Sequence, residues 1–406
     1  MEIEKVFVLG AGFMGNGIAQ VAALSGYRVT MCDVSEERLE AGLEAIRSSL
    51  GKLVSKERIT AEQGDAALAN LATTVDMEEA READLVVEAV PEDPRLKKRV
   101  FAELDRICPP HAILASNTSA IPISSLASAT SRPERVVGVH FFGPVPLLRL
   151  VEIIRGVQTS GETMRIADEW ARSLGKETVL VLRDHAGFVA NRVNIPTNIE
   201  AVRVIEEGLA TPEEIDRATG GYEAGVGPMQ IIDNAGLDVG YRAALAIYED
   251  TRDAKFLPPP LLRRMVAAGL LGRKSGRGFY DYSTGKRESY FPPVHSGETG
   301  EEHEARMRSV LNRLLLPAIL EAVALVEAGV ASPEDVDRAS RLGFNLPLGQ
   351  LEMADAMGLD TVMETALTIH GETGDPKFLP PPLLRRMVAA GLLGRKSGRG
   401  FHSYED

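Results

Sequence analysis

The sequence predicts a Rossmann-type α/β domain with a doubly wound sheet, followed by two tandem all-helical domains. Three observations support this prediction. Short apolar runs alternate with helical patterns over the first 184 residues, strand signals nearly vanish from about Asp184 onward, and a helical stretch then occurs twice. At 406 residues the chain is too long for one ordinary hydrophobic core, so two or three domains are expected.

The first 184 residues contain seven short apolar runs that predict strands. Helical patterns separate the earlier runs, for example Gly15–Ser25 and Ser35–Leu53. This alternation indicates a mostly parallel sheet with helices on both faces. The last runs lie closer together, so we expect antiparallel pairing at that edge. The predicted strands are Val6–Leu9, Arg28–Cys32, Leu85–Ala89, Ile113–Ser116, Val136–His140, Leu150–Ile154 and Val179–Leu182.

An internal repeat organises the rest of the chain. Residues 255–279 read KFLPPPLLRRMVAAGLLGRKSGRGF, and residues 377–401 repeat them letter for letter. Weaker matches extend upstream at a spacing of 121, such as Asn191-Arg192 with Asn312-Arg313. Two copies with so long a period indicate tandem duplication rather than a solenoid. The predicted domains are 1–184, 185–283 and 304–406, with a polar linker at 284–303.

The composition limits the possible partners. A net charge of −13 argues against nucleic acid or an anionic membrane as the main partner. Two cysteines cannot form a disulfide framework, so a reducing compartment fits best. Met1 leads straight into a predicted strand without a signal-peptide pattern, and no continuous apolar run reaches the roughly 18 residues of a membrane span. We therefore expect a cytoplasmic protein.

A dinucleotide-binding loop follows the first predicted strand. The residues Gly10, Ala11, Gly12, Phe13, Met14 and Gly15 form G-x-G-x-x-G before a helical pattern, and the second predicted strand leads to Asp33. The glycines permit a tight turn and close approach to a pyrophosphate, which the helix N-terminus attracts. Asp33 would bind ribose hydroxyls and repel a 2′-phosphate, so NAD is favoured over NADP. A structural turn or an FAD site is the alternative interpretation of this loop.

Polar side chains lie at the ends of later strands, where open α/β sheets bind ligands. Ser119 follows Ile113–Ser116, His140 ends Val136–His140, and Glu152 lies in the next strand. Histidine titrates near neutral pH and suits a base that takes a hydroxyl proton, and a carboxylate would orient it. The alternative is that His140 is a hydrogen-bonded core histidine. His185, at the predicted domain junction, is the main rival base.

The motifs together resemble the short-chain 3-hydroxyacyl-CoA dehydrogenases, including bacterial 3-hydroxybutyryl-CoA dehydrogenases. The matching stretches are VLGAGFMGNGIAQ at the first loop, LVVEAVPE at 85–92, ASNTS at 115–119, GVHFFGP at 138–144, LVEII at 150–154, GFVANR at 187–192 and GRKSGRGF at 272–279. The resemblance covers nearly the whole chain. It implies a Rossmann-type domain, NAD as the cofactor, an acyl-CoA substrate and no metal.

The resemblance also assigns roles to individual residues. It implies that His140 is the catalytic base, Glu152 its orienting carboxylate, and that Ser119 and Asn191 hold the substrate. Cofactor contacts would come from the loop residues Gly10 to Gly15 and from Asp33, Glu92, Lys97, Ser119, Gly143 and Lys274. Ser49 and Lys56 would contact CoA, together with Ser119. Arg47, Lys52, Lys56 and Arg58 form a basic patch suited to CoA phosphates, or else a solvated helix face.

Two positions depart from the family pattern. Gly143 stands where the family usually has an asparagine, which puts rate or substrate in doubt. The first helical copy has Glu223-Ala224-Gly225-Val226-Gly227 in place of an Asn-x-Pro-x-Gly turn that the second copy keeps at 345–349. These departures keep two alternatives open: a dehydrogenase of a non-CoA 3-hydroxy acid resembling gulonate or carnitine, and a catalytically idle structural or NAD-sensing protein.

The duplication bears on oligomeric state. In single-copy members of the family, the resemblance implies, the helical domain forms the dimer contact and closes over the active site. A tandem pair would reproduce that contact inside one chain. We therefore expect either a monomer with pseudo-dimeric helical domains or a homodimer. Lys396 duplicates Lys274, and the sequence does not show which of them faces a cofactor.

Overall fold

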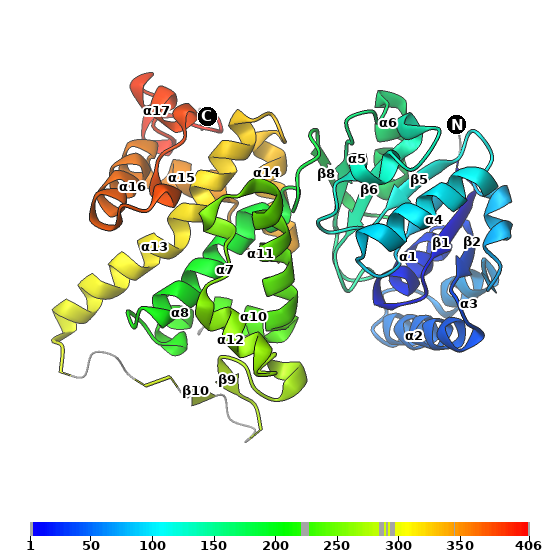
Figure 1. Cartoon of the computed structure of the whole chain (residues 1–406), viewed down its shortest axis with the longest axis horizontal. Helices are drawn as coiled ribbons and strands as arrows, with labels where there is room; N and C mark the ends of the chain where they lie inside the picture. Colours follow the sequence, from blue (N-terminus) through cyan, green and yellow to red (C-terminus); the bar gives the residue numbers. More distant parts are fainter. Residues whose placement is uncertain are drawn as a thin grey trace. The chain divides into compact units, whose positions relative to one another are not determined.

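The computed structural model describes residues 3–220, 227–283, 288–289, 291–292, 297–344 and 346–404. The chain forms two compact units, which are described separately (Figure 1). Unit 1 comprises Met1–Phe188 and Gly329–Leu346, and unit 2 comprises Val189–Ala328 and Pro347–Asp406. The predicted helical domain 304–406 therefore contributes residues to both units.

An eight-stranded sheet forms the centre of unit 1, in the order β3-β2-β1-β4-β5-β6-β7-β8. The strands from β3 to β6 are parallel, whereas β7 pairs antiparallel with β6, as expected for that edge. The central strands are buried along their length, as in sheets covered on both faces. The strands are β1 (Lys5–Leu9), β2 (Arg28–Cys32), β3 (Leu71–Thr74), β4 (Leu85–Glu88), β5 (Ile113–Ser116), β6 (Val136–Phe141), β7 (Leu150–Ile154) and β8 (Glu177–Val181).

Strand β3 was not predicted from the sequence. Its four residues, Leu-Ala-Thr-Thr, are too few and too weakly apolar to show an alternating pattern. As an edge strand it is only partly buried, so the sequence carries no continuous apolar run there. The other seven strands lie where they were predicted, within one or two residues.

The helices of unit 1 pack on this sheet. Helix α1 begins inside the glycine motif, at Phe13, and buries small residues such as Gly15, Gly17 and Ala19, which lets it lie close to the strands. Ser35 caps α2, and Asp93 caps α4 through the Leu96 amide. These helices are α1 (Phe13–Leu24), α2 (Glu36–Ser55), α3 (Ala61–Ala69), α4 (Pro94–Ile107), α5 (Ile123–Ala127) and α6 (Gly161–Ser173).

A segment of the second helical copy completes unit 1. Helix α14 (Pro333–Phe344) packs against β7 and β8. The Leu182 amide donates to the Val330 carbonyl oxygen at 2.7 Å, and the Leu180 amide donates to the Asp335 carboxylate at 3.4 Å. This segment therefore covers the edge of the sheet at β8, where exposed backbone groups would invite aggregation.

Unit 2 is built from helices of both copies. Those of the first copy are α7 (Ala190–Glu206), α8 (Pro212–Ala218), α10 (Pro228–Ala235), α11 (Leu237–Thr251) and α12 (Pro260–Ala267). Those of the second are α13 (Gly300–Glu327), α15 (Gln350–Met357), α16 (Leu359–Thr373) and α17 (Pro382–Ala389). The expected linker 284–303 contains the short strand β10 (Glu288–Ser289), which pairs with β9 (Tyr280–Asp281), and the first residues of α13.

The two copies contact each other along α7 and α13 (Figure 1). Arg192 binds Glu321 across this contact, and the equivalent residues Arg313 and Glu200 bind each other in the reverse direction. Lys255 binds Glu321, and its equivalent Lys377 binds Glu200. Each pair therefore recurs with the copies exchanged, as in an isologous dimer interface.

Helix α13 is long and apolar enough to cross a membrane by length and composition alone. Within unit 2, however, it packs against α7 and carries Arg313 and Glu321 in the ion pairs just described. The apolar part of the helix is 61% buried. These features are those of a central helix in a folded core.

Candidate active site

The dinucleotide loop turns between β1 and α1. Gly10 has a φ of 110°, and its amide donates to the Cys32 carbonyl oxygen at 2.7 Å. A Cβ on Gly15 would lie 1.8 Å from the Gly10 carbonyl oxygen, so no larger residue fits there. By contrast, a Cβ on Gly12 would meet nothing within 4 Å. Open space at the N-terminus of α1 suits a pyrophosphate.

Asp33 lies beside this loop at the end of β2. Its Oδ2 accepts from the Ala11 amide at 2.8 Å, and its Oδ1 accepts from the Val34 amide at 2.7 Å. These bonds fix the carboxylate next to the loop and leave further lone pairs for ribose hydroxyls. The nearest cation, Arg38, is 4.0 Å away and mostly exposed. The loop and Asp33 together fit NAD.

Strands β6 and β7 bring His140 and Glu152 together. The strands pair antiparallel, and the two residues are directly opposite in the register. Opposite residues project from the same face of a sheet, so the hairpin converts a separation of 12 residues into contact. His140 Nδ1 lies 2.8 Å from Glu152 Oε2, and both side chains are buried.

Ser119 extends this pair into a line of three side chains. Its Oγ lies 3.1 Å from His140 Nε2. When Nδ1–H donates to Glu152, the other ring nitrogen is left as an acceptor for a hydroxyl proton. The rings of Phe142 and Phe188 flank the imidazole, with centroids 4.4 and 5.7 Å away. His185, the rival, lies in the turn before α7, where its carbonyl oxygen accepts from the Phe188 amide.

Glu92 organises the loop that carries Ser119. Its Oε1 accepts from Thr118 Oγ1 at 2.5 Å and from the Ser119 amide at 2.9 Å. Lys97 Nζ lies 3.2 Å from Glu92 and 2.6 Å from Glu88, which is fully buried. Lys97 is itself only 1% exposed, whereas Glu92 is 43% exposed. Of these two predicted cofactor residues, Glu92 is thus the one open to a ligand.

Glu88 was not among the predicted site residues. Its carboxylate accepts from Lys97, from Ser116 Oγ and from the Val90 amide. A signal was present, because a glutamate inside the apolar run Leu85–Ala89 must find partners when it is buried. Glu88 and Lys97 form a buried ion pair beneath the Ser119 loop.

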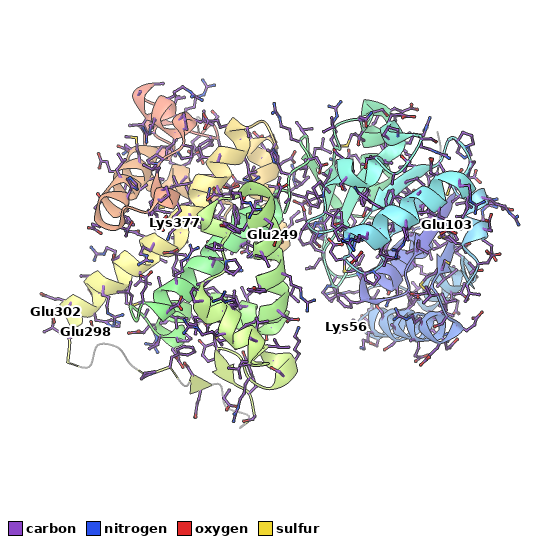
Figure 2. All side chains as sticks on the ribbon, in the orientation of Figure 1. Lys56, Glu103, Glu249, Glu298, Glu302 and Lys377 are labelled. Atoms are coloured by element: carbon purple, nitrogen blue, oxygen red, sulfur yellow. The ribbon has the colours of Figure 1, made fainter. Side chains whose placement is uncertain are left out.

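Ser49 and Lys56 line a cavity of about 740 Å³ between α1, α2 and the segment 144–147. Ser49 lies in α2, and Lys56 caps its C-terminal end (Figure 2). Lys52 and Arg58 of the predicted basic patch line the same cavity, whereas Arg47 binds Glu40 on the surface. The cavity is therefore cationic, with apolar surface from Phe13 and residues 145–147.

Gly143 lies against side chains of the dinucleotide loop. A Cβ at this position would lie 2.4 Å from the Phe13 ring and 3.1 Å from the Met14 sulfur. Phe13 is 65% exposed and belongs to the glycine loop. Gly143 and Phe13 are thus matched, because the space of a side chain at one position is taken by the ring of the other.

Asn191 and Lys274 belong to unit 2. Asn191 is half-buried in the first turn of α7. Lys274 forms an ion pair with Asp238, and Lys396 forms the same pair with Asp360. The departing turn of the first copy, residues 223–227, falls outside the described residues except for Gly227.

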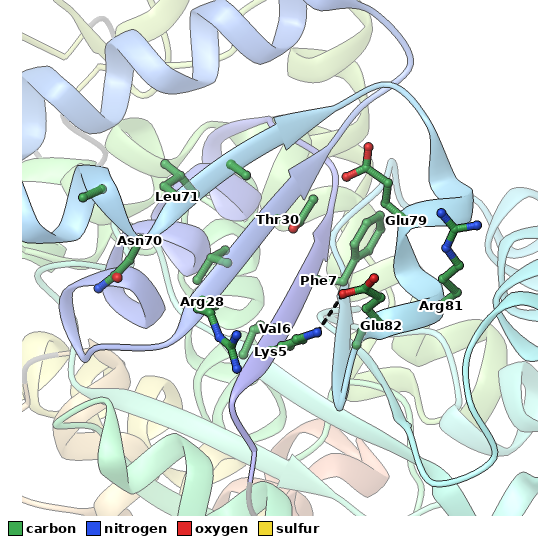
Figure 3. A pocket seen from close by; sticks show the side chains of 14 residues that line it. Lys5, Val6, Phe7, Arg28, Thr30, Asn70, Leu71, Glu79, Arg81 and Glu82 are labelled. Atoms are coloured by element: carbon green, nitrogen blue, oxygen red, sulfur yellow. Dashed lines mark hydrogen bonds and ion pairs between the residues drawn. The ribbon is translucent and has the colours of Figure 1, made fainter.

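A second cavity, of about 690 Å³, lies over the amino ends of β1 and β2 (Figure 3). Its charges are of both signs, and Lys5 binds Glu82 within it. In an open α/β sheet the ligand site is at the carboxyl ends of the strands, so this cavity is at the opposite edge. We assign it no role.

Cys32 and Cys108 are unbridged, and burial raises the pKa of each thiol to about 12, so neither is a nucleophile. Among the described residues, one group has the geometry of metal ligands: Glu214, Glu298 and His303. The Arg306 guanidinium already binds both carboxylates, at 2.8 and 2.6 Å.

Family models identify the chain. The model of the 3-hydroxyacyl-CoA dehydrogenase NAD binding domain matches residues 5–185. The model of the 3-hydroxyacyl-CoA dehydrogenase C-terminal domain matches twice, at 187–282 and 310–404. The chain belongs to the 3-hydroxyacyl-CoA dehydrogenase family. It is accordingly an oxidoreductase that uses NAD(H), and its C-terminal domain is duplicated.

Known relatives differ in how much of the chain they match. A probable 3-hydroxybutyryl-CoA dehydrogenase of Bacillus subtilis is 45% identical over 283 residues, which are 70% of this chain and 98% of the relative. The 3-hydroxyadipyl-CoA dehydrogenase of Escherichia coli is 31% identical and covers 95% of this chain. A crystal structure of 3-hydroxybutyryl-CoA dehydrogenase from E. coli K12 matches with a TM-score of 0.86 and 29% identity, over 96% of this chain and 99% of that one.

Proposed function

We propose that the enzyme interconverts a short (S)-3-hydroxyacyl-CoA, such as 3-hydroxybutyryl-CoA, and the corresponding 3-ketoacyl-CoA. The observation that carries this proposal is the hydrogen-bonded line from Ser119 through His140 to Glu152. This line of side chains lies at the carboxyl ends of β5 and β6. The dinucleotide loop follows the carboxyl end of β1, at the same end of the parallel strands. The relatives named 3-hydroxybutyryl-CoA dehydrogenase support the short acyl chain.

Each side chain has a role in this proposal. His140 Nε2 takes the proton of the substrate 3-hydroxyl, and the Glu152 carboxylate stabilises the imidazolium that forms. Ser119 Oγ holds the 3-oxygen in line with Nε2, while Asn191 holds the thioester side. NAD, when bound, accepts the hydride that leaves the carbinol carbon. In the reverse direction His140 returns its proton to the oxygen.

The cavity beside α2 supports CoA as the handle of the substrate. Ser49, Lys56 and their cationic neighbours suit the phosphates of CoA, and a small free hydroxy acid would leave them without a role.

We further propose that the enzyme is a cytoplasmic monomer in which α7 and α13 replace the dimer contact of single-copy relatives. The reciprocal ion pairs of Arg192 and Arg313 support this arrangement, since they reproduce an isologous interface inside one chain. The buried, unbridged cysteines suit a reducing compartment.

The test is the oxidation of NADH by acetoacetyl-CoA, followed at 340 nm. His140→Ala should lower kcat about 10²- to 10⁴-fold, the usual contribution of a general acid–base, and leave NADH binding by calorimetry unchanged. His111→Ala is a matched control, because His111 also pairs with a carboxylate, Asp84 at 3.2 Å, but on the surface. No NADH loss with the wild-type enzyme would refute the proposed reaction. Near-normal turnover by His140→Ala would refute only the choice of base.

A further inference from the structure

Glu88, the last residue of β4, carries a fully buried carboxylate to which the proposed reaction gives no role. The side chain is 0% exposed, and its partner Lys97, whose Nζ lies 2.6 Å from Glu88 Oε1, is 1% exposed. A buried ion pair often stabilises a protein no more than apolar residues of the same volume. The pair therefore calls for a role other than stability.

One path of contacts leads from Glu88 through Lys97 to the loop that carries Ser119. Lys97 Nζ also lies 3.2 Å from Glu92 Oε2. The other oxygen of Glu92 accepts from Thr118 Oγ1 at 2.5 Å and from the Ser119 amide at 2.9 Å. Because Glu88 gives Lys97 a second negative partner, the ammonium does not draw the Glu92 carboxylate away from the loop.

A second path crosses the sheet directly. Glu88 and Ser116 are opposite each other in the parallel register of β4 and β5, so their side chains project from the same face. Ser116 Oγ donates to Glu88 Oε2 at 2.7 Å and accepts from the Thr118 amide at 3.2 Å. Both paths therefore begin at one carboxylate and end beside Ser119, whose Oγ lies 3.1 Å from His140 Nε2.

The place of Glu88 in the sheet also favours a role at the site. The strand order reverses between β1 and β4, and open α/β sheets bind ligands in the crevice outside the strand ends at this point. The next residue, Ala89, lies against the dinucleotide loop, since a Cβ on Gly10 would be 2.6 Å from the Ala89 carbonyl oxygen. Glu88 is thus a fixed point between the cofactor loop and the Ser119 loop.

We propose that Glu88 is a positioning residue, which holds the Ser119 loop from below so that Ser119 Oγ stays in line with His140 Nε2. This inference rests on the proposed function, in which Ser119 holds the 3-oxygen of the substrate. Glu88 is fully buried, so it acts through its partners Lys97 and Ser116.

The test is a double-mutant cycle between Glu88→Gln and Ser119→Ala, with kcat for acetoacetyl-CoA and NADH as the readout. Glutamine keeps the shape of the side chain and removes its charge, so Lys97 should draw Glu92 away from the Ser119 amide. Glu88→Gln should lower kcat about tenfold in the wild-type background, the size of one hydrogen bond, and less than about twofold in the Ser119→Ala background. A residue that acts on stability alone would not show this dependence on Ser119.

Asp105→Asn is the matched control. Asp105 lies on α4, the helix that also carries Lys97, and forms an ion pair with Arg132 in which each side chain is 13% exposed. Its substitution should lower the melting temperature, because it leaves a half-buried cation without its partner, and should leave kcat unchanged. A fall in kcat equal to that of Glu88→Gln would show that any loss of charge beside α4 impairs turnover, and would overturn the proposal.

Ser116→Ala is a second variant, which keeps the ion pair and cuts only the path across the sheet. It should lower kcat about threefold when Ser119 is present and leave kcat unchanged in the Ser119→Ala background. It replaces Glu88→Gln if that variant does not fold. For either variant, a normal kcat or an equal loss in both backgrounds would overturn the positioning role.

Nitrogen NMR of histidine-labelled protein tests the inference apart from the reaction. The Nε2 signal of His140 reports its contact with Ser119, so Glu88→Gln should shift this signal in the same direction as Ser119→Ala, and Asp105→Asn should leave it in place. An unmoved signal in Glu88→Gln would overturn the role of Glu88. If the signal moves but the wild type does not oxidise NADH with acetoacetyl-CoA, the proposed reaction is wrong and the positioning role stands.

Discussion

In the first helical copy the carbonyl oxygen of Leu209 accepts a hydrogen bond from Arg306 of α13. In the second copy the equivalent carbonyl, at Val330, accepts from the backbone of Leu182 beside strand β8. The acidic residue five positions later shows the same difference. Glu214 accepts from Arg306, whereas its equivalent Asp335 accepts from the Leu180 amide. The same part of the repeat thus meets a helix in one copy and a sheet edge in the other.

The lengths of α7 and α13 explain how the first copy finds its neighbour. Helix α7 has 17 residues and begins where unit 1 ends, whereas α13 has 28 and begins about three turns before the equivalent position. Those extra turns carry His303 and Arg306. They cover the surface of α8 in the first copy. The nucleotide-binding domain contacts the equivalent surface of the second copy, and a single chain has no second such domain to contact α8. The equivalent surfaces of the two copies are therefore covered by different elements of the same chain, α13 in the first copy and strand β8 in the second.

Elsewhere the copies are alike. Asp233 accepts from the amides of Phe279 and Tyr280, and its equivalent Asp355 accepts from those of Phe401 and His402. These carboxylates hold the loops that end the two identical 25-residue segments. The comparison shows that identical sequence with identical local partners gives the same loop, while divergence is concentrated where the neighbours differ.

The largest expected effect concerns the symmetric part of this comparison, Glu200 and Glu321. Both carboxylates are buried, and each binds an arginine and a lysine of the other copy. Glu200→Gln and Glu321→Gln should each lower the free energy of unfolding by about 3–5 kcal/mol, because each leaves buried cations uncompensated. The loss should be slightly larger at Glu200, which also binds Arg203.

Urea unfolding followed by circular dichroism measures both values. Glu169→Gln, which breaks the exposed pair with Arg165, is the control and should cost less than about 1 kcal/mol. A large effect at one glutamate and none at the other would show that the contact between the copies is not symmetric in energy.

A smaller effect is expected where the copies differ. Asp335→Ala should destabilise the protein by about 1–2 kcal/mol, since the Leu180 amide and Arg338 lose their acceptor. Hydrogen exchange should accelerate at the amides of Leu180 and Leu182 and stay unchanged at the start of α13. Glu214→Ala should do the reverse, because its partner Arg306 lies on α13. The same exchange pattern from both variants would contradict the division of neighbours.

A pH effect is expected at Glu298, which lies just before α13 (Figure 2) and binds Arg306. Hydrogen bonds from Arg306, opposed by desolvation and aided by His303, lower the pKa of Glu298 from 4.5 to about 2. A carboxylate with a lowered pKa in the folded state stabilises it fully above the unfolded pKa, and this stabilisation is lost as the pH falls through the folded value. The melting temperature of Glu298→Gln should therefore lie below that of wild type at pH 6, and the gap should close as the pH falls from 4.5 toward 2.

The control for this titration is Glu304→Gln, an exposed carboxylate in the first turns of α13. Its melting temperature should follow that of wild type throughout. A gap between Glu298→Gln and wild type that persists unchanged down to pH 3 would show that the charge of Glu298 does not hold the extension of α13.

The fold was largely predictable because its signals are local. The periods of the apolar runs located seven of the eight strands in the sheet, and their spacing predicted the antiparallel edge. It was not predictable that residues 329–346 belong to unit 1, because the equivalent helices of the two copies, α8 and α14, both begin with Pro-Glu. Helices α14 and α8 differ in their neighbours, because α14 packs against β8 whereas α8 packs against α13.

The candidate site was predictable where its residues lie in or next to the predicted strands. The proximity of His140 and Glu152 follows from one hairpin, and the structure brings both to Ser119. The buried pair of Glu88 and Lys97 depends on the packing of α4 beside β5, which no sequence period reveals.

The smallest expected effect concerns Lys274 and Lys396, and its measurement tests whether these equivalent lysines have the same role. Lys274 and Lys396 are equally exposed, at 46%, and form equivalent ion pairs with Asp238 and Asp360. Exposed pairs contribute little, so Lys274→Ala and Lys396→Ala should each change the unfolding free energy by less than about 1 kcal/mol. If Lys274 contacts the cofactor, as the family resemblance implies, only Lys274→Ala should raise the KM for NADH, by severalfold. Since the local structures match, a difference in KM between the variants would come from the ligand alone, whereas equal values would remove Lys274 from the cofactor site.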